Sequence, residues 1–321
     1  MITALFFGCL GIAAIYVFVT GKHTLGLLLV FGFTQDSIRK LTPGEPIIFV
    51  VTVGIVFGAV LLGIWARKGF AESLEPFVRY TRKIQIPILV FLFILVLQFI
   101  YSLVSYGNVI VGFIGLTTYL APFLAVIVGY YLANDVEDIR RFMYLYIAAG
   151  GLVAVSVLAS FMGLDWAIFK EVGSGLKIYD QGTVLKSYSG IMRTGEVAAW
   201  HISTAACLII ALVVTSSKPR NFFIVTAIVG LLMLAVALTG RRKMLMLVTL
   251  FIVIYFLVYL YYRKTLETKY FFTVIATLLI AWVVLETISM ENYSDSLRNY
   301  IVRSSTVFGD ASGRFVELGI T

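Results

Sequence analysis

Residues 86–104 read IPILVFLFILVLQFIYSLV, an apolar run without a single charged side chain. A helix that crosses the hydrocarbon core of a bilayer needs about 20 such residues, so this run predicts a transmembrane helix. Runs of the same kind recur at residues 1–20, 47–65, 109–133, 143–162, 197–215, 222–240, 244–262 and 270–288. A shorter run at residues 24–33 predicts a broken or tilted crossing, if it spans at all. We therefore predict an all-α polytopic integral membrane protein with about ten transmembrane helices, or about nine without the short run.

The composition of the whole chain agrees with this fold class. Of its 321 residues, 60% are hydrophobic and 13% are charged, whereas soluble domains average about 45–50% and about 25%. These values exclude a water-soluble enzyme, a disordered chain and a disulfide scaffold. Cys9 and Cys207 lie inside apolar runs, where we expect free thiols that pack as small hydrophobes. No repeat or soluble region is visible, so we predict a single integral membrane domain over residues 1–321.

The net charge of +8 has a topological explanation. Cytoplasmic loops collect Lys and Arg, and residues 66–85 form the most basic loop, which we therefore place in the cytoplasm. Alternation puts three further loops, each with at least two basic residues, on the same side: residues 134–142, 216–221 and 263–269. The external side then receives residues 34–46, 105–108, 163–196, 240–243 and 289–321. Because the basic residues follow topology, we expect no nucleic-acid partner.

Arg241, Arg242 and Lys243 break this rule, because they are three consecutive cations on the external side. One interpretation is that their side chains extend to phospholipid headgroups, so that membrane lipids are their partners. A second is that the predicted topology is wrong in this stretch. The third is a binding site for a phosphate or pyrophosphate at the outer membrane surface, because the planar guanidinium of Arg donates to two phosphate oxygens at once.

The end of the external loop 163–196 carries further candidate site residues. Arg193 and Glu196 are three apart at a predicted helix start. They either contribute to a ligand site or pair with each other, or Glu196 favours the helix N-terminus. His201 lies about one turn into the membrane, where an ionisable residue is either functional or a hydrogen-bonded structural group.

The external segment 289–321 contains three more arginines, Arg298, Arg303 and Arg314, in a polar stretch with glycines and small hydroxyl residues. Such a stretch either wraps an anionic or sugar-like ligand or forms a solvated loop. The chain has no P-loop, no H-E-x-x-H or G-x-S-x-G motif, and no closely spaced metal-ligating set. We therefore expect neither a metal nor another cofactor.

Three patches together resemble a known family. They read GLTTYLAPF at residues 115–123, RTGEVAA at 193–199, and LTGRR at 238–242 followed by SGR at 312–314. Their order and spacing resemble the superfamily of O-antigen ligases and O-antigen polymerases, which are bacterial polytopic membrane glycosyltransferases. The resemblance implies a multi-pass protein of the bacterial inner membrane, with its two larger external segments in the periplasm. It also implies transfer or polymerisation of an undecaprenyl-pyrophosphate-linked glycan at the periplasmic face.

The resemblance also assigns partners and residue roles. The acceptor would be a glycan or a lipid, and other polysaccharide-assembly proteins would be partners. The donor pyrophosphate would be bound by Arg193, Arg241, Arg242 and Arg314. Further contacts to the anion or the glycan are expected from Lys243, Arg298 and Arg303. The acceptor hydroxyl needs a base within hydrogen-bond reach, for which Glu196 is the first candidate and His201 the second.

Two features depart from the family pattern. Family members continue into further helices after the Gly-Arg loop, so we expect this chain, which stops at Thr321, to lack those C-terminal helices. Ligases also place a functional histidine near the later motif, and none follows His201, so Glu196 or His201 substitutes or the chemistry differs. Two other classes stay open: a lipid-linked oligosaccharide flippase or transporter, and a non-catalytic membrane subunit of a polysaccharide assembly system.

Overall fold

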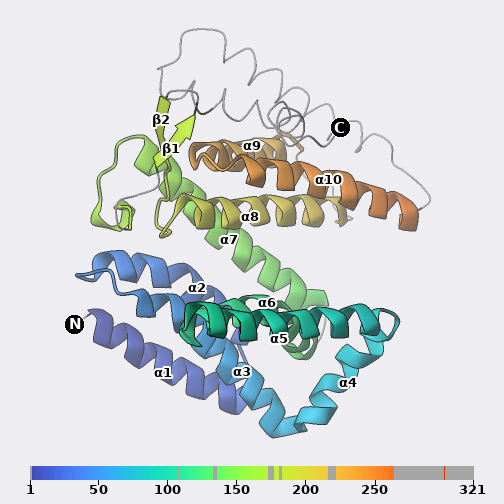
Figure 1. The fold of residues 1–321 in the computed structure, drawn as a ribbon. Helices are drawn as coiled ribbons and strands as arrows, with labels where there is room; N and C mark the ends of the chain where they lie inside the picture. The colour runs from blue at the N-terminus through green and yellow to red at the C-terminus, as the bar shows by residue number, and fades with distance from the viewer. Residues whose placement is uncertain are drawn as a thin grey trace. The chain divides into compact units, whose positions relative to one another are not determined.

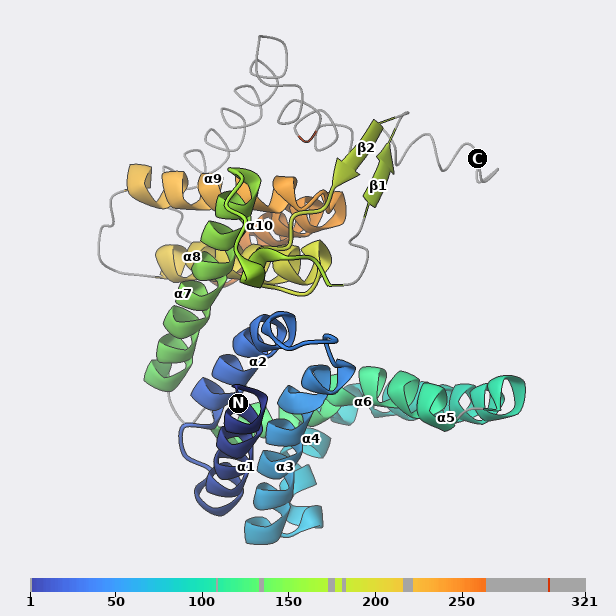
Figure 2. The same cartoon turned by 90° about the vertical axis from the view of Figure 1, so that its left-hand side faces the viewer.

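The computed structural model describes residues 2–107, 109–132, 136–172, 177–180, 183–215, 222–263 and 300, and these are mostly helical. Their contacts divide the chain into two compact units, Met1–Gly32 with Val50–Phe142 and Phe33–Phe49 with Met143–Thr321. Figures 1 and 2 show the helices and strands of both units from two directions. The single membrane domain expected over residues 1–321 stays a prediction.

The first unit is built from long apolar helices. Its elements are α1 (Ile2–Thr20), the first part of α2 (Thr24–Leu41), α3 (Thr52–Lys68), α4 (Phe70–Thr81), α5 (Gln85–Tyr106), α6 (Val109–Leu132) and the start of α7 (Val136–Phe161). Helix α1 packs along α3, and α5 packs along α6. Val17, Val56 and Val60 are fully buried in the core of this unit.

The second unit contains the end of α2, most of α7 and a cluster of three helices. Its other elements are the 3₁₀ helix Ala167–Phe169, β1 (Lys177–Asp180), β2 (Thr183–Lys186), α8 (Gly195–Thr215), α9 (Phe222–Leu238) and α10 (Arg242–Arg263). The two strands pair antiparallel, with Lys177 opposite Lys186. Helix α8 packs against both α9 and α10 (Figure 1). Small alanines on α8 have no exposed surface, which allows its backbone to approach its neighbours closely.

Six helical segments of the described residues are long and apolar enough to cross a membrane: Ile2–Thr20, Ile47–Lys68, Arg82–Ser105, Gly115–Leu132, Val136–Phe161 and Gly195–Val213. A shorter apolar helix covers Ile224–Leu238. Many large apolar side chains on these helices are exposed, as expected where lipid is the solvent. These features confirm the predicted helical, membrane-protein class. The count of about ten stays a prediction, and the run at 270–288 lies outside the described residues.

Three predicted loops are wrong in part. Helix α2 does not stop at residue 33 but continues to Leu41, so residues 34–41 are helical. The basic loop 66–85 contains helix α4, and helix α7 begins at Val136 inside the predicted loop 134–142. The reason is that hydropathy marks where the apolar run ends, whereas charged and amide side chains continue a helix readily. Helix α2 ends where Pro43 and Gly44 follow, which is the stronger stop signal.

The two cysteines of the chain are both free. Cys207 packs in a buried cluster with Val248 and Ile252, which confirms its prediction as a small hydrophobe. Cys9, in contrast, is exposed on α1. Exposure of an apolar-run residue is ordinary where the surrounding solvent is lipid.

Candidate functional site

Three segments that are distant in sequence meet in the second unit. They are the end of α2 (residues 33–41), the segment 187–194 between β2 and α8, and the turn 239–241 between α9 and α10. Ser37 Oγ donates a hydrogen bond to the Ile191 carbonyl at 3.3 Å. Ser187 Oγ donates to the Thr239 carbonyl at 2.8 Å. The sequence predicted that these connections share one side of the protein, and the contacts join them.

Asp36 forms the buried centre of this cluster. Its Oδ2 accepts a hydrogen bond from the backbone N–H of Arg193 at 3.1 Å, and its Oδ1 lies 3.9 Å from the Arg193 guanidinium. Asp36 is 1% exposed, whereas the side chain of Arg193 is 30% exposed. Burial raises the pKa of Asp36, an effect that the hydrogen bond and the nearby cations oppose. The carboxylate therefore anchors Arg193 from the protein side and leaves its guanidinium partly exposed.

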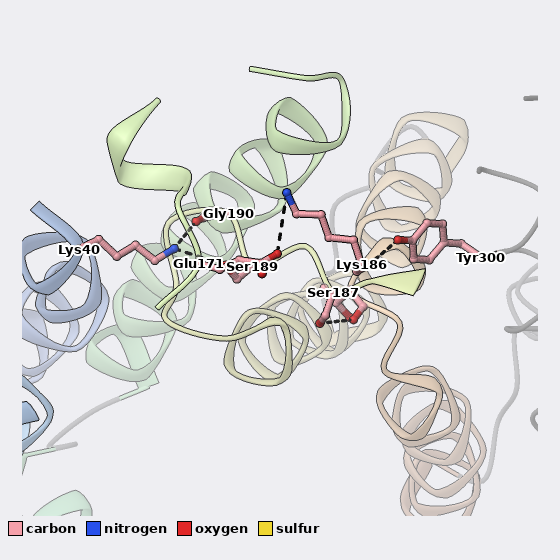
Figure 3. A network of polar contacts seen from close by, with 8 residues as sticks. Lys40, Glu171, Lys186, Ser187, Ser189, Gly190 and Tyr300 are labelled. Carbon is pink, nitrogen blue, oxygen red and sulfur yellow. Dashed lines mark hydrogen bonds and ion pairs between the residues drawn. The ribbon is translucent and has the colours of Figure 1, made fainter. Parts of the chain in front are cut away.

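Lys40 lies one helical turn after Asp36 and contacts the same segment (Figure 3). Its Nζ donates to the Gly190 carbonyl at 2.7 Å and to Ser189 Oγ at 3.3 Å. Residues four apart lie on one helix face, so α2 presents a carboxylate and an ammonium group together. Burial lowers the pKa of Lys40 to about 8, although the negative charges of Asp36 and Glu171 oppose this shift.

Gly190 allows the segment to make these contacts. Its φ of +54° lies in the left-handed region, which residues with a Cβ rarely adopt. A Cβ at this position would lie 2.8 Å from the backbone nitrogen of Val157 on α7. Next to it, Ser156 Oγ accepts the backbone N–H of Ile191 at 3.0 Å. Helices α2 and α7 thus hold the residues before Arg193 from two directions.

The patches RTGEVAA and LTGRR lie against each other. Thr194 Oγ1 accepts the backbone N–H of Val197 at 3.3 Å, as an N-terminal cap of α8 does. A Cβ on Gly195 would lie 3.2 Å from the Thr239 carbonyl, so only a residue without a side chain fits here comfortably. Glu196 forms an ion pair with Lys243 at the start of α10. Two of the patches that carry the family resemblance are therefore neighbours in space.

The ion pairs differ from one sequence interpretation. Arg193 and Glu196 were candidates to pair with each other, but the structure pairs Arg193 with Asp36 and Glu196 with Lys243. The Glu196 and Lys243 side chains are 44% and 63% exposed, so that contact faces solvent or headgroups. Arg241 has a buried Nε without a hydrogen-bond partner among the described residues. Arg241 directly precedes Arg242, which begins α10.

His201 is in contact with two aromatic residues. Its Nδ1 lies within hydrogen-bond distance of Tyr146 Oη, at 2.8 Å, and its ring centroid is 4.4 Å from that of Phe33. This hydrogen bond is what the structural interpretation of His201 expects. A catalytic role for His201 stays a prediction.

The remaining predicted arginines, Arg298, Arg303 and Arg314, lie outside the described residues. Tyr300, the one described residue after 263, donates from its hydroxyl to the Lys186 carbonyl (Figure 3). Lys186 in turn lies 3.9 Å from Glu171, whose buried Oε1 has no hydrogen-bond partner in the described part of the chain. Residue 300 is therefore beside the segment that leads to Arg193.

Sequence reasoning missed Asp36, Lys40 and Ser156. The signal for the first two was present, because an acid and a base four apart directly follow the short apolar run 24–33. If the helix continued past the run, this spacing would put both residues on one helix face. Ser156 had no signal, since a lone serine in an apolar helix is common. The described residues contain no group of three or more His, Cys, Asp and Glu that could hold a metal ion.

No family model matches the chain, and no match is found among curated proteins or solved structures.

Proposed function

We propose that the protein transfers or polymerises an undecaprenyl-pyrophosphate-linked glycan at the periplasmic face of the bacterial inner membrane, in O-antigen or exopolysaccharide synthesis. The observation that supports this proposal best is the contact between the segments 193–196 and 239–243, where Gly195 approaches the Thr239 carbonyl and Glu196 pairs with Lys243. These segments carry Arg193, Arg241 and Arg242, three of the four arginines to which the family resemblance assigns pyrophosphate binding. They come together at the N-termini of α8 and α10, where helix dipoles also favour an anion.

In the proposed reaction, a hydroxyl oxygen of the acceptor forms a bond to the anomeric carbon of the donor glycan. The bond from that carbon to the pyrophosphate oxygen breaks, and undecaprenyl pyrophosphate leaves with the electron pair, with inversion at the carbon. Negative charge develops on the leaving group, so the guanidinium groups of Arg193 and Arg241 stabilise the transition state. One well-aimed donor of this kind contributes roughly 3–4 kcal/mol.

Glu196 is the proposed base that takes the proton of the acceptor hydroxyl. Its side chain is 44% exposed. Glu196 follows Arg193 by three positions in the sequence and forms an ion pair with Lys243. The ammonium group of Lys243 favours the ionised carboxylate, which is the form that accepts a proton. Asp36, the other carboxylate of the cluster, is 1% exposed and thus less accessible to a hydroxyl of an incoming glycan.

Two arginine variants and a matched control test the proposal. Arg193→Ala and Arg241→Ala should each lower the amount of surface polysaccharide by at least about 100-fold. They should also increase the pool of undecaprenyl-pyrophosphate-linked glycan in extracted lipids. Arg79→Ala is the control, because Arg79 lies in the first unit, is exposed and pairs with its helix neighbour Glu75. It should leave both quantities unchanged.

The same assay separates the other two function classes. Unchanged polysaccharide in both site variants, at wild-type protein levels, would overturn the proposal and favour a non-catalytic subunit. A flippase would lose polymer too, but its accumulated donor would stay on the cytoplasmic face. A lectin added to spheroplasts distinguishes these cases, because it reaches only donor glycans on the periplasmic face.

A further inference from the structure

A buried carboxylate needs an explanation that the proposed chemistry does not supply. Asp36 is 1% exposed at the end of α2, and a charge removed from water is costly unless it is paired and hydrogen-bonded. Burial accordingly raises the pKa of Asp36. Its position does not suit a base, because it lies behind Arg193 rather than at the surface.

The two oxygens of Asp36 make unequal contacts. Oδ2 accepts the backbone N–H of Arg193 at 3.1 Å, a normal hydrogen bond. Oδ1 is 3.9 Å from the guanidinium, too far for a hydrogen bond, and has no hydrogen-bond partner among the described residues. Asp36 thus binds the main chain of Arg193 without using the N–H donors of its side chain. Those donors are what a phosphate oxygen would need.

Lys40 supplies the second half of the arrangement. It holds the Gly190 carbonyl at 2.7 Å, three residues before Arg193, and its charge balances that of Asp36. Because the charges of Asp36 and Lys40 balance each other, the two residues hold residues 190–193 without cancelling the positive charge of Arg193. Between these anchors, Ser37 and Ser156 bind the carbonyl and the N–H of Ile191. The backbone from residue 190 to 193 is therefore held on several sides.

We propose that Asp36 is a positioning residue, which fixes the main chain of Arg193 through its Oδ2 so that the guanidinium is aimed at a pyrophosphate group. This role rests on the function proposed above. It follows the general rule that an anion-binding side chain is effective only when a supporting residue holds it in place. Because the hydrogen bond to the main chain of Arg193 needs only an acceptor oxygen, an asparagine at position 36 preserves it.

The test is the affinity for undecaprenyl pyrophosphate of the full-length protein in lipid nanodiscs, measured for the wild type and five variants. Asp36→Ala removes the acceptor and should weaken binding by about 10-fold, the equivalent of one hydrogen bond of about 1.4 kcal/mol. Asp36→Asn keeps an acceptor oxygen and should bind at least as tightly as the wild type. Asp165→Ala, at an exposed aspartate of the same unit, is the matched control and should change nothing.

A double variant shows whether Asp36 acts through Arg193. In an Arg193→Ala background, adding Asp36→Ala should cause no further loss of affinity, because the group that it positions is absent. A general structural role predicts an additional loss, and it also predicts that affinity follows thermal stability across the variants. The thermal midpoint of each variant is therefore measured alongside binding.

The outcomes separate this inference from the proposed function. The positioning role is overturned if Asp36→Asn loses as much affinity as Asp36→Ala. It is also overturned if the loss in the double variant is the sum of the losses in the two single variants. If Arg193→Ala binds weakly while Asp36→Ala binds normally, the inference fails and the proposed function stands. If the wild-type protein does not bind undecaprenyl pyrophosphate, the proposed function fails and the inference with it.

Discussion

Replacement of Gly190 by alanine should destabilise the protein much more than the same change at Gly44. Both glycines lie in the second unit and have positive φ, +54° at Gly190 and +77° at Gly44. In each variant the new alanine must adopt a left-handed conformation, which lowers the free energy of unfolding by roughly 1–2 kcal/mol. The two positions differ in their surroundings. A Cβ at Gly44 meets no atom within 4 Å, whereas at Gly190 it meets the backbone of α7.

The surroundings of Gly190 determine the size of the difference. The Val157 backbone nitrogen would lie 2.8 Å from the new Cβ, and backbone atoms of a helix cannot rotate away. Overpacking of this kind costs about 1–3 kcal/mol. If the segment shifts instead, the hydrogen bond from Lys40 to the Gly190 carbonyl weakens, and such a bond to a charged group contributes about 1.5–3 kcal/mol. Either way we expect Gly190→Ala to lose about 2 kcal/mol more than Gly44→Ala.

Thermal unfolding followed by tryptophan fluorescence measures this difference, since the chain has four tryptophans. For a protein of this size, 1 kcal/mol corresponds to roughly 2–4 °C, so the midpoint of Gly190→Ala should lie about 4–8 °C below that of Gly44→Ala. Equal midpoints for the two variants would refute the reasoning. They would mean that the segment before Arg193 does not pack on α7 through Gly190.

Two other predictions concern helix packing and pH. A Cβ at Gly150 would lie 2.6 Å from Ala205 Cβ on α8, whereas one at Gly151 meets nothing within 4 Å. Gly150→Ala should thus lower the free energy of unfolding by about 1–3 kcal/mol. Gly151→Ala should raise it by up to about 1 kcal/mol. Thermal midpoints that shift in the same direction in the two variants would contradict this. Burial lowers the pKa of Lys40 from 10.5 to about 8, so the unfolded chain binds more protons between these pH values and stability should rise with pH there. Between pH 7.5 and 9.5 the free energy of unfolding of the wild type should rise by about 2 kcal/mol relative to that of Lys40→Met. If the difference in the free energy of unfolding between the two proteins is the same at both pH values, the prediction is wrong.

Part of the candidate site could be read from local patterns. The cations after Gly240 were visible because they follow an apolar run on the side where basic residues are disfavoured, and Arg193 was visible because it shortly precedes one. Their partners were not visible. Arg193 lies just before α8 and pairs with Asp36 instead of Glu196, and the two partners are 157 positions apart in the chain. Spacing along one helix predicts which residues can meet, but it says nothing of competitors from another element.

The amino-acid sequence by itself determined that this is a helical membrane protein and roughly where its apolar helices lie. The reason is that the bilayer imposes a composition on each crossing, which is a local property of about 20 consecutive residues. Only the tertiary structure decided that α2 continues to Leu41 and brings Asp36 and Lys40 to the segment before Arg193. Hydrogen bonds between distant segments depend on how the helices pack and on glycines that permit close approach, and no local window of sequence contains that information.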